Sequence, residues 1–326
     1  MSIQISSRRW ALGLMAGLLC ASAAVAQYPD RPIHFIVPYP PGGATDNLSR
    51  TLMPYIAKNL GDDVTIVVNN QPGAAGSIGT RALANAKPDG YTFGLVTMPP
   101  VLSVPIERDT GWTWKSFDLL ANVVDDPVSF AVSKESGIKS LQDLIELGKR
   151  KPGGISVGTT GVGSDDHFLA MVFQRQTGTP IMHVPFKGSA DIITALRGGV
   201  IDVAAINISE TVSLLKGGTP IIALAQGAST RGDMAPDVPT FKELGVDMEL
   251  SAMRGMAAPK GLPAEVSERL VGAIQKAAAD PEFLEKARNQ LLQPINYNSP
   301  DEFGRRLQAL EGDFEQIWKE TPWVDK

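Results

Sequence analysis

The stretch HFIVPYPPGGATD, residues 34–46, turns an apolar run into a glycine-bearing loop and then into a segment with helical spacing. The apolar run predicts a buried strand, and Gly42, Gly43 and Asp46 mark a turn and a helix start. Backbone N–H groups at a helix start have no partner within the helix, and the helix dipole adds positive potential there. The loop is therefore a candidate anion cradle. A Pro-Gly turn capped by Asp46 is the alternative, and local chemistry favours neither.

The same alternation of short apolar runs and helical patterns continues along the chain. Strands are expected at 33–39, 65–68, 130–133, 155–157 and 201–206, and helices at 47–60, 140–149 and 166–176. The last sixty residues are expected to be mainly helical, with Ser299 as a helix cap before Pro300. A series of βαβ units predicts an α/β fold with largely parallel sheets.

A chain of 326 residues is longer than a single core usually supports, so two lobes are expected. No Pro/Gly/Ser-rich stretch is long enough to be a flexible linker. We therefore expect the chain to cross between the lobes on ordered strands, at 119–124 and 221–225. This places 27–122 with 226–326 in lobe 1 and 123–225 in lobe 2, with a hinge that permits closure over a cleft.

The first 26 residues have the pattern of a secretory signal peptide. Arg8 and Arg9 precede an apolar run at 11–19 and a small-residue run at 21–26, so we expect cleavage before Gln27 and a periplasmic protein. The arginine pair is compatible with either the general or the twin-arginine export route. Cys20, the single cysteine, lies in the segment expected to be removed, so neither a disulfide nor a cysteine metal site is expected.

A second strand-to-loop-to-helix passage is ISVGTTGVGSDDH, residues 155–167. Thr160 and Ser164 can donate hydroxyl hydrogen bonds, and Gly161 and Gly163 let a ligand approach the backbone closely. Ser164 as a helix cap is the alternative for that residue. His167 fits either a structural histidine or a catalytic base, and the pair of loops suits a ligand with two polar ends.

Two further segments supply candidate ligand contacts. In PFKGSAD, residues 185–191, Lys187 can face an acidic ligand and Ser189 can either bind ligand or cap the next helix. Asn207 ends the strand at 201–206, where ligands of open α/β sheets bind. Its alternative is a cap, for which Ser209 competes.

Composition and motifs argue against several other functions. The formal net charge is −5 with basic residues scattered, so no nucleic-acid partner is expected. The glycines at 73–79 lack dinucleotide-binding spacing, and no Gly-Lys-Ser/Thr or His-Glu-x-x-His motif is present, so we expect no cofactor and no metal. A secreted hydrolase using Ser164 and His167 is the enzymatic alternative, but the segment around Ser164 is not a nucleophile elbow.

Six segments together resemble the Bug-type extracytoplasmic solute receptors, the binding components of tripartite tricarboxylate transporters. They are YPDRPI (28–33), VPYPPGGATD (37–46), NQPGAAG (70–76), PDGYT (88–92), VPFKGS (184–189) and DVPT (237–240). The resemblance spans nearly all of the chain after the signal segment. It implies a two-lobed periplasmic binding protein of type II-like fold with two crossing strands, and no enzymatic activity.

The resemblance further implies that the first two loops hold a ligand carboxylate in the interlobe cleft, partly through water. The positions that it nominates are Tyr39, Gly42, Gly43, Ala44, Thr45, Asp46, Thr97, Thr160, Gly161, Gly163, Ser164, Lys187, Ser189 and Asn207. Asp46 is a poor direct partner for a carboxylate, so we expect it to orient the backbone or to accept from an amine or hydroxyl of the ligand.

The chain departs from the family pattern at two places. TMPPV, residues 97–101, is more apolar than the corresponding loop of many relatives, and Ile206 stands where an acidic residue often precedes the asparagine. We therefore expect a small organic acid as ligand, with an aromatic or less polar acid as one option. The expected partners are the permease subunits of a tripartite transporter or, alternatively, a membrane sensor, and the expected state is a monomer.

Overall fold

The opening stretch forms the strand, loop and helix that its pattern predicts. In a computed structural model, which describes residues 28–150, 153–320 and 322–324, β1 (Ile33–Val37) leads through a loop into α2 (Ala44–Leu60). The predicted signal segment, 1–26, lies outside the described residues. Ile33, Phe35 and Val37 of β1 are fully buried on one face of the strand, whereas His34 on the other face is exposed.

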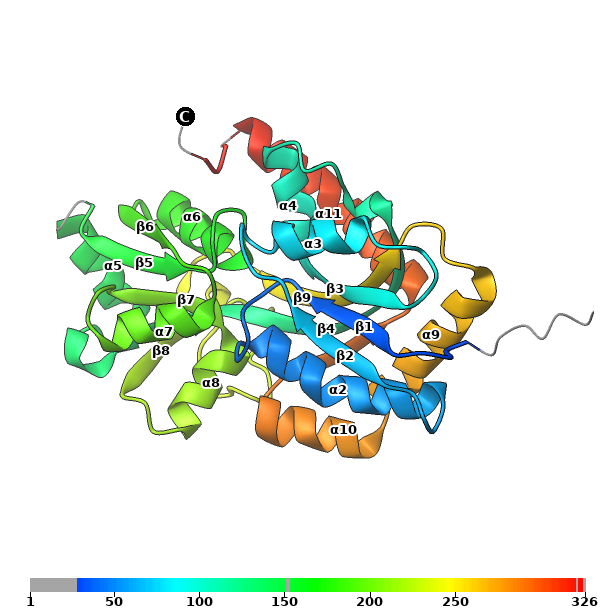
Figure 1. Ribbon diagram of the computed structural model, residues 1–326. Coiled ribbons are helices and arrows are strands. Elements are labelled where there is room, and N and C mark those ends of the chain that lie inside the picture. The colour runs from blue at the N-terminus through cyan, green and yellow to red at the C-terminus, as the bar shows by residue number, and fades with distance from the viewer. Residues whose placement is uncertain (1–27, 151–152, 321, 325–326) are drawn as a thin grey trace, which may run out of the picture. The chain divides into compact units, whose positions relative to one another are not determined.

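The first sheet has the strand order β2-β1-β3-β9-β4, with β10 also paired to β4. Its strands are β1, β2 (Ile66–Asn70), β3 (Thr92–Met98), β9 (Ser251–Pro259), β10 (Ile295–Asn298) and the first part of β4 (Phe117–Ser133). Its helices are α2, α3 (Ser77–Ala84), α4 (Pro100–Glu107), α9 (Ala264–Ala278), α10 (Pro281–Lys286) and α11 (Pro300–Glu320). In Figure 1, α2 packs with α9 and α10, and α11 packs with α4. The predicted C-terminal helices therefore cover the sheet formed earlier in the chain.

The second sheet has the strand order β8-β4-β7-β5-β6. Its strands are the second part of β4, β5 (Ile155–Thr159), β6 (Ile181–Pro185), β7 (Val203–Asn207) and β8 (Ile221–Gln226). Its helices are α5 (Leu141–Arg150), α6 (Asp165–Thr177), α7 (Ser189–Arg197) and α8 (Ile208–Lys216). Short 3₁₀ and π segments occur at Trp114–Ser116, Lys134–Ser136, Lys242–Leu244 and Ala287–Leu291. Pairing is parallel at β5 but antiparallel at β4 and β9, so the sheets are mixed rather than largely parallel.

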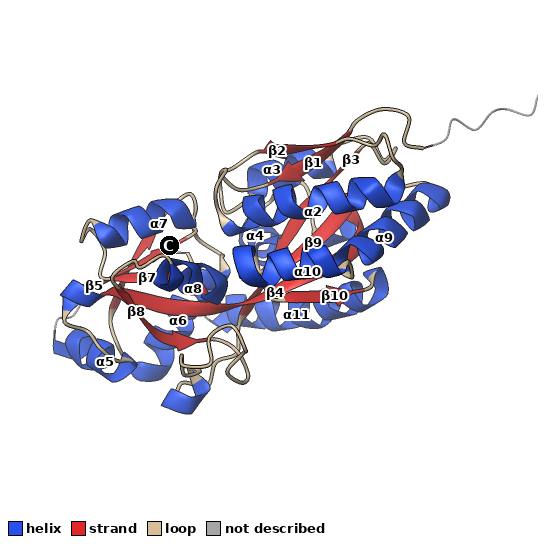
Figure 2. Cartoon of the chain, turned by 90° about the horizontal axis from the view of Figure 1, so that it is seen from below, coloured by secondary structure: helices blue, strands red, loops and turns tan. Residues whose placement is uncertain are grey.

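Strand β4 belongs to both sheets, as Figure 2 shows. Its pairing with β9 ends at Pro127 opposite Ser251, and its pairing with β7 begins at Val128 opposite Asn207. The chain returns beside this point, where the amide of Val128 donates to the carbonyl of Leu250 at 3.0 Å. The predicted crossing at 119–124 therefore lies on the correct strand but just before the crossing. The predicted crossing at 221–225 is wrong, because these residues form β8 within the second sheet.

The segment after β8 packs on the second sheet. Phe241, Val246 and Met248 are buried in one core with Phe130, whose ring centroid lies 5.5 Å from that of Phe241. This apolar contact draws 227–250 toward the second sheet, although our sequence-based division placed the segment in lobe 1. We propose lobe boundaries near 127/128 and 250/251 in place of 122/123 and 225/226.

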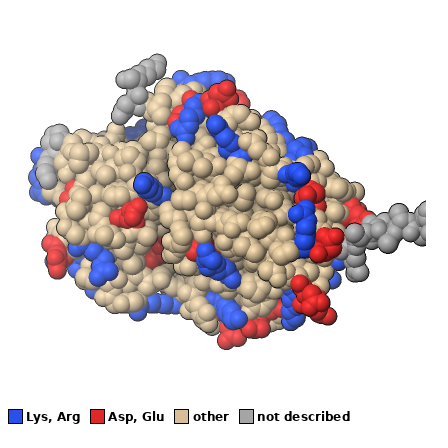
Figure 3. Space-filling view, in the orientation of Figure 1, with Lys and Arg blue, Asp and Glu red and all other residues tan. Residues whose placement is uncertain are grey.

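The described helices and the surface add two observations. No helix within the described ranges is long and apolar enough to cross a membrane. On the face seen in Figure 3, acidic and basic side chains are interspersed, without a large area of one sign.

Candidate functional site

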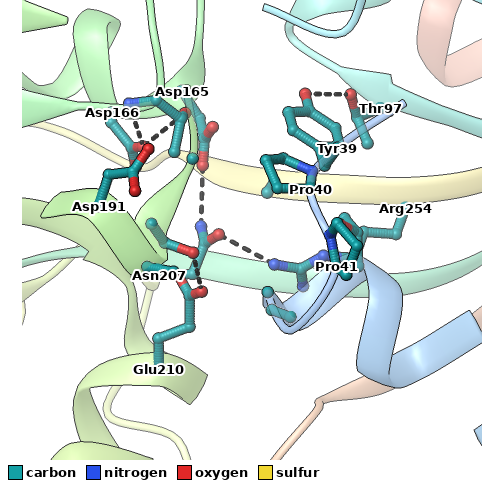
Figure 4. Close-up of a pocket in the computed structure, with 18 of the residues that line it drawn as sticks. Tyr39, Pro40, Pro41, Thr97, Asp165, Asp166, Asp191, Asn207, Glu210 and Arg254 are labelled. Atoms are coloured by element: carbon teal, nitrogen blue, oxygen red, sulfur yellow. Dashed lines mark hydrogen bonds between the residues drawn. The ribbon is translucent and has the colours of Figure 1, made fainter. Parts of the chain in front are cut away.

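A cavity of about 70 Å³ lies where the two sheets meet, at the ends of strands from both (Figure 4). The first sheet contributes the loop after β1, the end of β3 and part of β9, and the second contributes the starts of α6, α7 and α8. The lining residues are Tyr39, Pro40, Pro41, Gly43, Ala44, Thr45, Thr97, Met98, Thr160, Asp165, Asp166, Gly188, Ser189, Ala190, Asp191, Asn207, Glu210, Ala252 and Arg254. Four helix N-termini therefore converge on one small space.

The first loop is held in place by Asp46, which lies behind it. This carboxylate accepts from the amide of Gly42 at 2.9 Å, from Nδ2 of Asn70 at 2.9 Å and from Nε of Arg50 at 3.0 Å. Burial acts to raise the pKa of Asp46, but the hydrogen bonds from these donors outweigh it and lower the pKa. Asp46 therefore orients the loop backbone from outside the cavity.

Two of the four helices present uncapped backbone amides. Helix α2 begins after Gly43 and α7 begins after Gly188, and neither glycine offers a side chain to cap the helix. The amides of Ala44 and Thr45 in α2, and the corresponding pair in α7, have no hydrogen-bond partner among the residues that the structure describes. A Cβ added at Gly43 would lie 3.7 Å from Oγ of Ser189, so the two helix starts face each other across a short gap. Both ends supply donors for an anion.

A buried arginine, Arg254 on β9, joins the elements of the cavity floor. Its Nη1 donates to Asp126 at 2.7 Å and to Gln293 at 2.9 Å, and its Nη2 donates to Oδ1 of Asn207 at 2.9 Å. Arg254 is 2% exposed and Asp126 is 0% exposed, so this is a fully desolvated ion pair. Nε of Arg254 has no partner among the described residues.

The carboxyl groups that line the cavity come from the helices of the second sheet. Oδ2 of Asp165 accepts from Nδ2 of Asn207 at 2.8 Å, and Oδ2 of Asp166 accepts from the hydroxyl of Thr160 at 2.8 Å and from its amide at 3.2 Å. Glu210 accepts from the hydroxyl of Ser189. Burial raises the pKa of Asp165, Asp166 and Glu210, and the charge of Asp165 adds to the increase at Asp166.

Eight of the fourteen nominated residues line this cavity: Tyr39, Gly43, Ala44, Thr45, Thr97, Thr160, Ser189 and Asn207. Tyr39 and Thr97 also share a hydrogen bond of 2.9 Å between their hydroxyls. Asn207 is not the side-chain cap of α8, because Asp126 accepts from the amide of Ser209 instead.

The other six nominated residues lie outside this cavity: Gly42, Asp46, Gly161, Gly163, Ser164 and Lys187. Gly42 lines a depression beside α8, and Gly161 and Lys187 line another beside Arg108. The carbonyl of Gly163 accepts from Ser103 at 2.5 Å. These positions lie in the loops that surround the cavity.

Ser164 and His167, the pair for the hydrolase alternative, serve the fold of α6. Oγ of Ser164 accepts from the amide of His167 at 3.1 Å, which makes Ser164 the cap of the helix. Nδ1 of His167 accepts from the amide of Gly163 at 3.1 Å, and its ring stacks on His183. The hydroxyl and the imidazole thus each have a structural partner, and neither side chain lines the cavity.

Sequence reasoning missed the charged lining of the cavity. Asp165, Asp166, Asp191 and Glu210 all lie in the first turn of a helix, where acidic residues are explained by the helix dipole alone. Arg254 carried a usable signal, because it is a lone charge within the otherwise apolar strand β9. The remaining missed lining residues are Pro40, Pro41, Met98, Gly188, Ala190 and Ala252.

Comparison with known proteins places the chain in a family. The model of the tripartite tricarboxylate transporter family receptor matches residues 48–309. The chain belongs to this receptor family. Protein BugT of Bordetella pertussis is 33% identical over 289 residues, which cover 86% of this chain and 88% of BugT.

Solved structures of similar proteins agree with this receptor family and its fold. Periplasmic binding protein BugD is 28% identical with a TM-score of 0.84, over 92% of this chain and 100% of that one. An R. palustris protein solved with adipate is 26% identical with a TM-score of 0.83, over 90% and 97% of the two chains. The Bug-type resemblance and the two-lobed periplasmic binding fold are therefore confirmed. Within the described residues of this receptor, no group of three or more His, Cys, Asp or Glu side chains is placed to hold a metal ion.

Proposed function

We propose that this receptor captures a small organic carboxylate in the cavity between its two sheets, outside the cytoplasmic membrane, and delivers it unchanged to permease subunits of a tripartite transporter. The observation that carries the proposal is the pair of uncapped helix starts at Ala44 and Ser189, which face each other across the cavity. Unpaired amides at a helix N-terminus bind carboxylates through both hydrogen bonds and the dipole. The adipate bound by the similar R. palustris protein supports this ligand class.

The proposal also states that the receptor does not convert its ligand and that its signal peptide is removed. The structural roles of Ser164 and His167 support binding without catalysis. Cleavage before Gln27 remains part of the proposal. We also propose that the receptor binds its ligand as a monomer.

A thermal-shift screen of organic acids tests the proposal. A ligand at a hundredfold excess over its Kd stabilises the native state by about 2.7 kcal/mol. With an unfolding entropy of about 2.1 cal/mol/K per residue over about 300 residues, this shifts Tm by about 4 °C. Adipate, succinate and their longer and shorter relatives form the panel, and chromatography of the incubated ligand checks that no product forms. A panel without any shift, or conversion of a ligand, contradicts the proposal.

Ala44→Pro removes one cavity-facing amide with little effect on the helix. Proline is favoured at the first helical position, and Gly43 before it has φ −79° and ψ 173°, which a following proline tolerates. Loss of one hydrogen bond to a charged carboxylate should weaken binding by about 10- to 100-fold. Ala264→Pro, at the first position of α9 and away from the cavity, is the matched control and should leave affinity unchanged.

A further inference from the structure

The cavity carries an excess of carboxyl groups over basic groups. Asp165, Asp166, Asp191 and Glu210 line it, whereas Arg254 is the one basic residue among its described lining residues. Figure 4 shows the carboxyls on the side formed by α6, α7 and α8. A plain dicarboxylate needs positive charge or donors at both ends. Apart from the uncapped amides at the start of α7, this side offers mainly acceptors.

Arg254 makes no hydrogen bond or ion pair with any of these four carboxyls, although its charge acts to lower the pKa of Asp165 and Glu210. Its charge is matched by Asp126, a fifth carboxylate that it contacts at 2.7 Å. Its second Nη donates to an amide oxygen, that of Asn207, rather than to a cavity carboxyl. The cluster therefore has no cation in direct contact with it among the described lining residues.

One carboxyl oxygen in the cluster lacks a partner. Asp165 and Glu210 each accept a hydrogen bond from a neighbouring side chain, and Oδ2 of Asp166 accepts two from Thr160. Oδ1 of Asp166 has none among the described residues, although Asp166 is 2% exposed and lines the cavity. A buried acceptor left without a donor costs about 1–3 kcal/mol, and more when it is charged. A ligand that supplies the donor recovers this energy.

We propose that the ligand carries a positively charged nitrogen in addition to its carboxylate, and that this nitrogen binds Oδ1 of Asp166. The inference deepens the proposed function, on which it rests. The carboxylate binds at the uncapped starts of α2 and α7, and the ammonium faces the acidic side of the same cavity. The ligand class is therefore a small amino acid or amino-substituted acid.

Matched pairs of acids test the ligand class by calorimetry. Succinate is compared with aspartate, glutarate with 4-aminobutanoate, and adipate with both 2-aminoadipate and 6-aminohexanoate. We expect the best amine-bearing ligand to bind at least about tenfold more tightly than the diacid with which it is paired, since a charge-assisted hydrogen bond to a buried acceptor gives that difference. If the unsubstituted diacid binds as tightly or more tightly in every pair, the inference is wrong while the proposed function stands. If neither member of any pair binds, the proposed function itself fails.

Asp166→Asn tests the residue. The amide keeps an acceptor for Thr160 but removes the charge, so the preference for the amine-bearing ligand should fall by at least about tenfold, while affinity for the plain diacid changes less than about threefold. Asp191→Asn removes an equal charge from an exposed position on the cavity and should cost the amine-bearing ligand far less, because solvent screens it. Equal losses in both variants would assign the effect to net charge and overturn the role of Asp166.

Proton release provides a second measurement that needs no variant. Burial raises the pKa of Asp166, and it also raises the pKa of Asp165 and Glu210, which line the same cavity. Binding of a cationic nitrogen favours the ionised carboxyl and releases protons, whereas a second carboxylate favours the protonated form and takes protons up. Arg254 and its partner Asp126 also act on Asp165 and Glu210 through their charges. Titrations in two buffers of different ionisation enthalpy should show net release with the amine-bearing ligand, and net uptake would contradict the proposal.

Discussion

Replacing Arg254 with methionine should destabilise the protein strongly, because it breaks the buried ion pair between the two sheets. Arg254 lies on β9 of the first sheet, and Asp126 lies on β4 next to the crossing point. Burial acts to lower the pKa of the Arg254 guanidinium, but the charge and the hydrogen bond of Asp126 have the larger effect and raise it. The pair is 2.7 Å apart and almost fully shielded from solvent. Methionine keeps most of the side-chain length and removes the charge.

The cost follows from what Asp126 retains after the substitution. The amide and hydroxyl of Ser209 still donate to it, but no cation remains beside it. Removing one partner of a buried pair costs about 3–5 kcal/mol, since the other charge is left uncompensated. At about 2.1 cal/mol/K per residue for about 300 residues, this lowers Tm by about 5–8 °C.

A double-mutant cycle separates the charge effect from lost packing. Tm and urea midpoints are measured for Arg254→Met, Asp126→Asn and the double variant. The double variant should be more stable than the sum of the single losses predicts, by about 2 kcal/mol or more, because neither charge remains alone in it. If Arg254→Met melts within about 1 °C of the parent, or if the two losses simply add, the reasoning about this pair is wrong.

Two further predictions concern other buried positions. Burial lowers the pKa of His167 to about 3, below its unfolded value of about 6.5, so only the unfolded state takes up a proton as the pH falls between these values. The variant His167→Asn keeps an acceptor for the amide of Gly163. Between pH 6 and 4, urea titrations should show that the free energy of unfolding of the parent falls by up to about 1.4 kcal/mol per pH unit relative to that of the variant. Equal pH slopes for the two proteins would contradict this. Gly255→Ala would place a Cβ 2.3 Å from the ring of Phe303 and should lower the free energy of unfolding by about 1–3 kcal/mol. The Cβ of Gly272→Ala in α9 meets nothing within 4 Å, so this variant should gain up to about 1 kcal/mol in stability. Thermal melts compare these two variants, and a gain at the first or a loss at the second would refute the packing argument.

Local patterns were enough to predict the elements around the first loop. The alternation of apolar runs with helical spacing located β1, α2, β5 and α6 to within a few residues, because these signals depend on neighbours in the sequence. The second crossing was missed for a different reason. Strand β8, which pairs with β4 inside the second sheet, has the same apolar sequence pattern as a strand that passes from one lobe to the other. Only the long-range pairing of the strand distinguishes the two cases.

The electrostatics of the site depend on long-range contacts of the same kind. Asp126 and Arg254 are 128 positions apart, and nothing local indicates that they meet. The glycine loops were recognised because glycine signals a backbone requirement at its own position. Thr160, a predicted donor, lines the cavity, but its amide and hydroxyl both donate to Asp166, a residue that sequence reasoning treated as part of a helix start.

The position of the carboxyls at helix starts explains how a single chain tolerates so many of them. Asp165, Asp166, Asp191 and Glu210 each lie in the first turn of their helix, where the dipole favours a negative charge by about 0.3–1 kcal/mol and by up to about 2 kcal/mol when partly buried. That contribution offsets part of the burial cost of Asp165, Asp166 and Glu210, whereas Asp191 is exposed. It does not supply a donor to any particular oxygen. The helix dipoles therefore help to stabilise the acidic cluster in the free protein. They leave Oδ1 of Asp166 without a hydrogen-bond donor, which a ligand nitrogen can supply.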